Sequence, residues 1–409
     1  MRLSLNSEAK ILILISAIHA VVGVFFGTFL ISYIMQISDN EAVSISIYNI
    51  ALFTALTAGF LLLADTVKRK NKMRVYRMNL FIQAASLITI ATVGENIAPF
   101  IAVFGAVQGF ASAFLHTPLN VIISEKVKKR MMVAYSGYNA MVGGIVSIAT
   151  PLILGFLITI GSYEYIAVFM LLFLCAAYVL SFFLHSHNPA AKRFSISNFI
   201  PLARRSILVR RVMFVEFLAG LSVHGPLGVV STMFVVFLFH TDFFLGLITS
   251  AFAVVSIIIS FLVGRFGRPE KFPALLVISN SLTIFAGLIF LLFTGKWSFL
   301  FYRLIQSSAM HFIMKVKHIN MFNTSNSAAC VAHDCRTEFL VVRETILNAG
   351  RILSFLILFT IGYSGNIEWL KYYLVFLTLV FAVAGAMSLK ICRGQSKSAL
   401  TIKPRRVSG

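Results

Sequence analysis

Acidic and charged side chains are scarce in this chain of 409 residues. Asp and Glu together number 14, and charged residues make up 12% of the sequence, whereas 59% of it is hydrophobic. A typical soluble domain carries about 25% charged and about 45–50% apolar residues. A chain with so little charge cannot cover one apolar core with a polar surface. The composition therefore excludes a water-soluble globular protein and indicates an integral membrane protein.

Cysteine is also rare, and the motifs of common catalytic sites are missing. Four Cys in 409 residues are too few for a secreted disulfide scaffold. Cys330, His333 and Cys335 stand close together, but the sequence lacks the second half of a zinc-binding pattern. There is no P-loop consensus and no legible nucleophile–base set. We therefore expect no enzyme activity, no cofactor, no bound metal and no ATP-driven transport.

Long apolar runs fill most of the chain. A helix needs about 20 apolar residues to cross a bilayer, whereas the strands of a barrel alternate in segments of about ten. The runs are continuous and long, so they predict helices. No small-x-small cleavage site follows the first run, which is therefore expected to stay as a membrane helix. The twelve predicted spans are 11–35, 43–64, 75–93, 98–123, 134–160, 164–184, 212–238, 243–263, 272–294, 297–314, 338–362 and 369–389.

Lysine and arginine predict the orientation of these spans. The 35 basic residues give a net charge of +21, yet they lie between apolar runs rather than in one patch, which argues against a nucleic-acid partner. With both termini cytoplasmic, Lys296 and Lys371 fall outside the cell, Arg303 and Arg351 fall within spans, and the others are cytoplasmic. This bias follows the positive-inside rule, and anionic lipid headgroups would add to it. The short loops indicate a multi-pass protein of the bacterial inner membrane.

The sequence divides into two halves that repeat. His19-x-x-x-Gly23 of the first span returns as His224-x-x-x-Gly228 of the seventh, and Gln108 of the fourth span has its counterpart in Gln306 of the tenth. Such matches at a constant offset are typical of duplicated transporter bundles. We predict a six-helix bundle at 1–184, a cytoplasmic linker at 185–211, a second six-helix bundle at 212–390 and a basic tail at 391–409. Within the linker, residues 199–209 are suited to an amphipathic segment on the membrane surface.

Three short motifs carry a resemblance to a known family. After the second span, Ala64, Asp65, Arg69 and Lys70 fit the loop signature G-x-L-A-D-R-x-G-R-[KR]. In the fourth span, Gln108-Gly109 fits R-x-x-Q-G, with Gly105 in place of the Arg. In the fifth, Thr150-Pro151-x-x-x-Gly155 loosely follows the antiporter signature G-P-x-x-G-G.

With these motifs the chain resembles the major facilitator superfamily of secondary transporters. The resemblance implies an all-α integral membrane fold of twelve transmembrane helices in two pseudo-symmetric six-helix bundles. It also implies alternating access around a central site that the first, fourth, seventh and tenth spans line.

Polar residues on those four spans are the candidate substrate-binding and coupling residues, because polar groups in a membrane usually face a cavity or a partner. Histidine can change charge near neutral pH, and a buried arginine can bind a carboxylate or phosphate. Alternatively, the histidines only bond to neighbouring helices, Arg303 forms an ion pair or snorkels, and Gly105 and Gly109 make a close helix contact. The candidates are His19, Gln108, His116, Asn120, His224, Arg303, Gln306 and His311.

A second set comprises the candidate gating and salt-bridge residues: Asp65, Arg69, Glu216, Glu344, Asn348 and Arg351. By the resemblance, Asp65 and Arg69 latch cytoplasmic helix ends; alternatively they only set orientation. Glu344, Asn348 and Arg351 share one face of the eleventh span. A charge as deep as Arg351 needs a partner, and Glu344 and Glu216 are the rival candidates.

The seventh span has a further feature, because Gly225-Pro226 follows His224 directly. This pair should break the helix, a common device where a transport helix must bend.

These observations predict a secondary transporter that moves a small molecule, driven by an ion gradient. Efflux of an antibiotic, peptide-like toxin or metabolite is the preferred interpretation. Its expected partners are the substrate, the lipid bilayer and, as candidate coupling ions, protons; we expect a monomer. Import of a nutrient or metabolite and flipping of a lipid or glycolipid remain alternatives. A sensor or assembly factor that kept the fold without translocation is a fourth.

Overall fold

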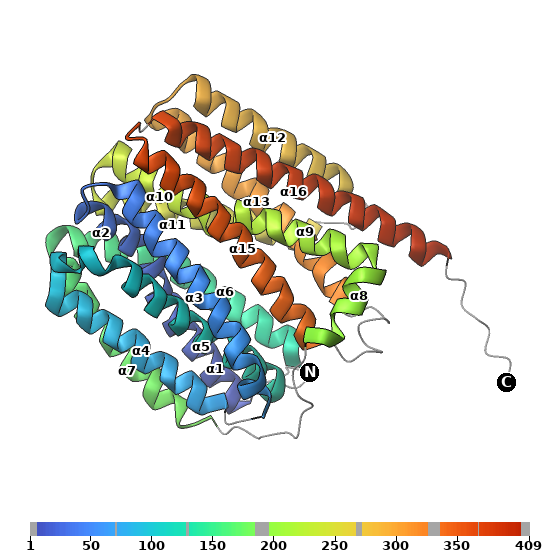
Figure 1. The fold of residues 1–409 in the computed structure, drawn as a ribbon, viewed down its shortest axis with the longest axis horizontal. Helices are drawn as coiled ribbons and strands as arrows, with labels where there is room; N and C mark the ends of the chain where they lie inside the picture. The colour runs from blue at the N-terminus through green and yellow to red at the C-terminus, as the bar shows by residue number, and fades with distance from the viewer. Residues whose placement is uncertain are drawn as a thin grey trace. The chain divides into compact units, whose positions relative to one another are not determined.

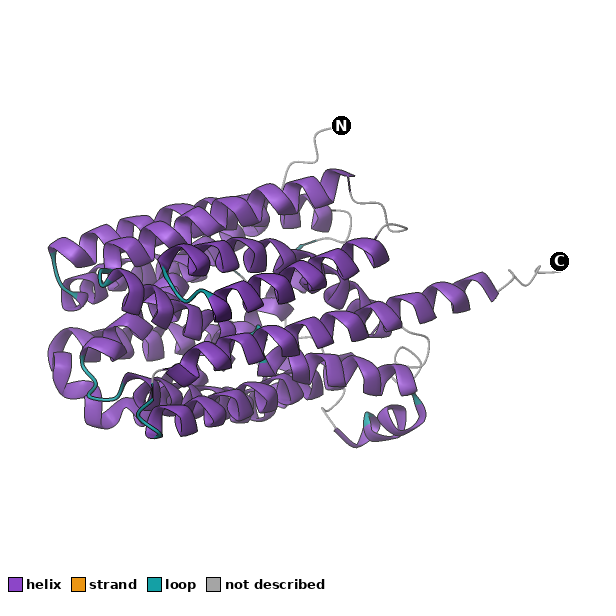
Figure 2. Ribbon diagram, turned by 90° about the horizontal axis from the view of Figure 1, so that it is seen from above, coloured by secondary structure: helices purple, strands orange, loops and turns teal. Residues whose placement is uncertain are grey.

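The described part of the protein is helical throughout. The computed structural model describes residues 6–69, 72–127, 131–184, 196–266, 272–325, 336–366 and 368–401, and no strand occurs among them (Figure 2). The predicted all-α class is confirmed for these residues. The helices, labelled in Figure 1 where there is room, are α1 Ser7–Val24, η1 Phe25–Phe29, α2 Leu30–Gln36, α3 Glu41–Arg69, α4 Lys72–Val93, η2 Gly94–Phe100, α5 Ile101–Lys126, α6 Met132–Ile160, α7 Tyr163–Ser181, η4 Ile196–Asn198, α8 Ile200–Arg205, α9 Ile207–Leu221, α10 Pro226–Phe239, α11 Asp242–Phe266, α12 Phe272–Leu292, α13 Lys296–Ser325, α15 Arg336–Tyr363 and α16 Glu368–Thr401.

Ten helical stretches among the described residues are long and apolar enough to cross a membrane. One of them, Lys72–Leu119, holds two of the predicted spans, which the 3₁₀ segment η2 separates. The predicted span 297–314 lies in α13, which is not among the ten; its Arg303, Gln306 and His311 lower its hydropathy. A multi-pass membrane protein is thus supported, while twelve spans with cytoplasmic termini remain a prediction.

Two of the spans are interrupted where backbone geometry departs from the α-helix. In the first span, η1 is a π-helical turn, a feature that often accompanies functional sites. In the seventh, α9 ends at Leu221 and α10 begins at Pro226, with Gly225 at φ 135° between them. Proline is well tolerated at a first helical position, whereas that φ favours glycine. The predicted break at Gly225-Pro226 is confirmed.

The contacts group the chain into two compact units that are described separately. Unit 1 comprises 1–194, 224–254 and 351–373, and unit 2 comprises 195–223, 255–350 and 374–409. In unit 1, α3 packs on α5, α4 packs on α5 and α7, and α1 packs on α6. In unit 2, α12 packs on α13, and α13 and α8 pack on α9. Unit 1 therefore contains helices of the first sequence half together with α10 and parts of α11, α15 and α16.

Two glycines allow α3 and α5 to approach closely in unit 1. A Cβ atom at Gly105 would lie within 3 Å of the carbonyl oxygen of Tyr48, and one at Gly109 would be as close to that of Leu52. Backbone atoms cannot swing aside as a flexible side chain does. Gly105 and Gly109 therefore make the close helix contact that the sequence left as one alternative.

This contact predicts a specific loss of stability. Gly109→Ala is expected to lower the free energy of unfolding by about 1–3 kcal/mol, because the added methyl group forces α3 and α5 apart. Thermal unfolding of the purified protein in detergent measures the change. The matched control is Gly137→Ala in α6, where a Cβ meets nothing within 4 Å. That variant should unfold at or slightly above the wild-type temperature; equal behaviour of the two variants would contradict the packing described.

Candidate functional site

A cavity of about 420 Å³ opens within unit 1 between α1, η1, α3, α4 and α5. A volume of this size suits a small molecule. Its lining is apolar and aromatic with a few neutral polar groups, and no Asp, Glu, Lys or Arg of the described chain takes part. The lining residues are Ser16, His19, Ala20, Gly23, Phe26, Gly27, Tyr48, Leu52, Gln83, Gln108, Ser112, Leu115, His116 and Leu119.

His19 is held in a fixed orientation on the α1 wall of this cavity. Its Nε2 shares a 2.8 Å hydrogen bond with the hydroxyl of Tyr76 on α4, and the two rings meet edge to face at 5.6 Å. Tyr76 and His19 are both buried. Within the described chain, Nδ1 of His19 has no hydrogen-bond partner. Tyr76 therefore fixes one nitrogen of the imidazole and leaves the other for a ligand or a proton. Sequence reasoning did not single out Tyr76.

The α5 wall of the cavity carries polar side chains at four-residue spacing. Gln108, Ser112 and His116 all line the cavity, and the side chain of Asn120 lies outside the described residues. Gln83 of α4 faces the same space, although no periodic pattern in the sequence marked it. Nε2 of Gln108 and Oε1 of Gln83 are buried without a hydrogen-bond partner in the described chain. A substrate with both an acceptor and a donor could bond to these two amides.

The candidates on α13 form a separate group in unit 2. A guanidinium nitrogen of Arg303 donates to Oε1 of Gln306 at 2.8 Å, and Gln306 is buried. Nε2 of Gln306 lies 3.6 Å from the sulfur of Met310. The side chain of His311 lies outside the described residues. Arg303 is thus oriented by a hydrogen bond to a residue of its own helix. In this orientation the guanidinium can still bind an anionic group.

His224 and Arg351 meet in unit 1 at the break of the seventh span. Nε of Arg351 donates to the backbone carbonyl of His224, and its guanidinium lies over the ring of Phe53, 4.7 Å from the centroid. Phe53 also stacks with Phe355. The charge of Arg351 is therefore stabilised by a backbone carbonyl at the helix break and by a cation–π contact with Phe53. The predicted pairing of Arg351 with Glu344 or Glu216 stays a prediction.

A buried ion cluster joins α9, α13 and α15 in unit 2. Glu216, fully buried, accepts from Nζ of Lys317 at 2.8 Å and from Arg343 at 3.2 Å, and Arg343 also binds Glu344. Asn348 lies buried one turn beyond Glu344. Burial and the neighbouring cations lower the pKa of His318, beyond the predicted span 297–314, so this imidazole is neutral at pH 7. Lys317 and Arg343 were not among the predicted partners, because nothing in one sequence shows which helices adjoin.

A second polar centre forms around Asp242, the first residue of α11, within unit 1. Its Oδ1 accepts from the hydroxyls of Ser32 and Tyr163, each at 2.7 Å, and its Oδ2 accepts from Nε2 of Gln36 at 3.1 Å. The donors lie on α2 and α7 of the first sequence half, whereas Asp242 belongs to the second. Sequence reasoning missed this centre, although an acid at the start of an otherwise apolar span is a signal that could have marked it.

Two further contacts join the same sequence halves in unit 1. A Cβ at Gly155 of α6 or Gly246 of α11 would clash with the backbone of the other helix, so these two helices touch at their glycines. The amide of Asn40, just before α3, donates to the carbonyl of Gly362 in α15 at 3.0 Å. In the orientation that the sequence predicts, both contacts and Asp242 belong to the extracellular side.

Comparison with known proteins identifies the family. The family model of the Major Facilitator Superfamily matches residues 11–354. The chain belongs to the major facilitator superfamily. Among curated proteins, the superfamily member resembles the uncharacterized protein YqgE of Bacillus subtilis (strain 168), with 23% identity over 358 residues, 86% of this chain and 82% of YqgE.

Solved structures show the same fold. A bacterial homologue of the iron transporter ferroportin in an inward-facing state has a TM-score of 0.70 at 13% identity, with 95% of this chain and 99% of that chain covered. A bacterial metal transporter reaches 0.64 at 13% identity, covering 95% and 99%. The nucleoside transporter NupG reaches 0.62 at 14%, covering 97% and 100%. At such identities the likeness extends to the fold of this superfamily transporter and not to its substrate.

The structure describes only some of the remaining predicted residues. Asp65 lies half-buried near the end of α3, and the side chain of Arg69 lies outside the described residues. Cys330, His333 and Cys335 also lie outside them. Among the residues described, no three His, Cys, Asp or Glu side chains gather as a metal site would require.

Proposed function

We propose that this superfamily member is a secondary transporter that exports a small, uncharged or amphipathic organic solute from bacteria by alternating access. The observation that carries the proposal is the cavity between α1 and α5, with its apolar wall, two imidazoles and two amides. Uncharged polar groups in an apolar cavity recognise a solute by hydrogen bonds. Two imidazoles without a carboxylate favour such a solute over a bare cation such as Ca²⁺ or Mg²⁺.

Alternating access requires a gate on each side of the membrane, and the Asp242 centre is our candidate for the extracellular one. It joins helices of the two sequence halves through three hydrogen bonds, and the Gly155–Gly246 and Asn40–Gly362 contacts reinforce it. Coupling by protons would use His19 and His116, which face one cavity. In the second sequence half, His224 and the α13 residues Arg303, Gln306 and His311 are proposed as further substrate-binding groups.

The bacterial inner membrane, twelve spans and cytoplasmic termini are part of the same proposal. The Bacillus relative and the cationic loops support the location. The export direction is supported by Pro151 and Gly155 of α6, which loosely match the antiporter signature. Gly155 also packs closely against the backbone of α11.

The site assignment predicts loss of transport in cavity variants. His19→Ala and Gln108→Ala are each expected to reduce transport about tenfold or more, since one lost hydrogen bond in a buried site costs about 1–3 kcal/mol. A susceptibility panel in an efflux-deficient bacterium is the measurement, with membrane expression checked by blotting. Thr92→Ala, an exposed hydroxyl on α4, is the matched control.

Each of three outcomes of this panel is informative. Resistance to one compound class, lost in the cavity variants and in Arg303→Ala but kept in Thr92→Ala, supports export and begins to name the substrate. Unchanged resistance in His19→Ala and Gln108→Ala would contradict the cavity assignment. No resistance to any compound, despite good expression, would favour import or lipid flipping, which uptake and lipid movement in oriented vesicles distinguish.

A further inference from the structure

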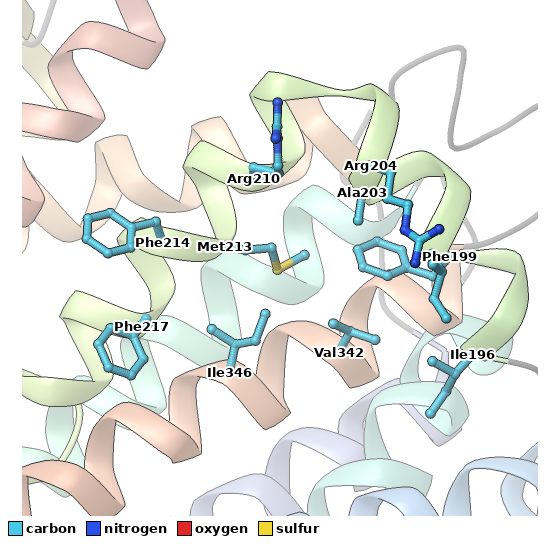
Figure 3. A pocket seen from close by; sticks show the side chains of 11 residues that line it. Ile196, Phe199, Ala203, Arg204, Arg210, Met213, Phe214, Phe217, Val342 and Ile346 are labelled. Atoms are coloured by element: carbon cyan, nitrogen blue, oxygen red, sulfur yellow. The ribbon is translucent and has the colours of Figure 1, made fainter.

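An open groove of about 700 Å³ lies in unit 2, where α8 turns into α9 and faces α15, and it shares no lining residue with the cavity of unit 1. Its floor is apolar: Figure 3 shows Val342 and Ile346 of α15 rising toward Phe199 and Met213. Phe199 and Met213 are buried in the core cluster of this unit, so the floor is firmly held. The groove is therefore a preformed feature of the packed unit.

The outer wall of the groove is apolar and exposed. Ile200 of α8 is 44% exposed and Phe214 of α9 is 49% exposed, and both line the groove. Exposed large apolar side chains next to a held apolar floor suit the hydrocarbon chain of a lipid. A small polar solute would leave most of this surface in contact with water.

Two arginines, Arg204 of α8 and Arg210 of α9, stand on the edge of the groove (Figure 3). Both are exposed, and no acidic residue lines the groove among the described residues. A guanidinium binds a phosphate through planar, multidentate hydrogen bonds. The edge thus carries two positive charges beside an apolar floor, which complements an anionic phosphate attached to a hydrocarbon chain.

The position of Arg204 and Arg210 in the chain indicates the level of the membrane at which the groove lies. Both arginines lie in the last part of the predicted cytoplasmic linker, residues 185–211, just before the predicted seventh span. We therefore expect them at the level of the inner-leaflet headgroups. The amphipathic pattern of residues 199–209, which include the short helix α8, predicts that this segment lies along the same level.

We propose that this groove binds one anionic phospholipid of the cytoplasmic leaflet, with an acyl chain on the Phe199–Met213 floor and the headgroup phosphate on Arg204 and Arg210. The site is separate from the substrate cavity, and its occupant is a bound lipid rather than a transported one. Such a lipid would tie α8 and the start of α9 to the membrane surface.

The test is native mass spectrometry of the full chain, released from nanodiscs that contain phosphatidylglycerol and phosphatidylcholine in equal amounts. The wild type should retain phosphatidylglycerol in preference to phosphatidylcholine. Arg204→Gln with Arg210→Gln should weaken that binding about 30-fold, since each cation near a membrane surface contributes about a fivefold factor. The matched control is Arg211→Gln with Lys390→Gln, which removes the same charge from exposed positions that do not line the groove.

A second variant tests the apolar part of the site. Ile200→Asp places a carboxylate on the groove wall at an exposed position, so the core cluster stays intact while the acyl chain loses its seat. It should also lose phosphatidylglycerol. Equal retention in the wild type and the double arginine variant would overturn the proposal, as would equal retention of the two lipids by the wild type. A dimer mass in place of bound lipid would overturn it too, because the groove would then hold a second copy.

Discussion

Glu216→Gln is expected to lower the free energy of unfolding by about 3–5 kcal/mol, the largest stability change that we predict. The substitution keeps the shape of the side chain but leaves Lys317 and one face of Arg343 without the carboxylate that they bind in the interior. Both cations are largely buried, so water cannot replace the lost partner. Thermal unfolding of the purified protein in one detergent measures the effect.

Two further variants separate the ion cluster from a general effect of charge. Glu368→Gln removes a carboxylate that is 70% exposed and pairs with Lys371, and it should cost less than about 1 kcal/mol. Glu216→Gln combined with Lys317→Gln should recover part of the loss, because Arg343 keeps Glu344. If Glu216→Gln unfolds at the wild-type temperature, the cluster does not hold α9, α13 and α15 together as described.

Asp242→Ala is expected to open the proposed extracellular gate. The variant deprives Ser32, Gln36 and Tyr163 of their shared acceptor and destabilises the closed arrangement by about 2 kcal/mol, or roughly 30-fold in population. Ala20 lines the cavity, so Ala20→Cys in a cysteine-free background reports access from outside the cell. A membrane-impermeant maleimide should label this cysteine faster in the Asp242→Ala protein.

The control for the gate is Asp39→Ala. Asp39 is an exposed acid on the same predicted extracellular side and takes no part in the Asp242 hydrogen bonds. Its loss should leave the labelling rate unchanged. Equal labelling rates in the wild type and the Asp242→Ala protein would show that the Asp242 hydrogen bonds do not control access. Faster labelling in both acid variants would point to surface charge and not to a gate.

Sequence patterns predicted helix type and several local features well. Continuous apolar runs predict membrane helices because every backbone polar group in lipid must be bonded within its own segment. The break at Gly225-Pro226 followed from the missing amide hydrogen of proline and the freedom of glycine. The motif around Asp65 and Gln108 led to the correct family, which the family model independently shows.

Pairing between distant residues was predicted less well. Glu216 was predicted as one of two rival partners for Arg351. The cations that it binds are Lys317, 101 positions away, and Arg343, which is further still. Tyr76, Gln83 and Asp242 gave no periodic signal, and their roles arise only because α4 adjoins α1 and α11 adjoins α2 and α7. A single sequence carries no record of such contacts when apolar helices can pack in many ways.

The sequence by itself determined that this protein is helical, spans the membrane and belongs to a transporter family. Those properties depend on local backbone chemistry, on hydropathy and on short motifs. Only the tertiary structure decided which polar groups share a cavity, which acid joins α2, α7 and α11, and which cations neutralise Glu216. The reason is physical: in a chain of apolar helices the hydrophobic pattern is nearly the same on every face. Close glycine contacts and a few buried hydrogen bonds then fix the neighbours.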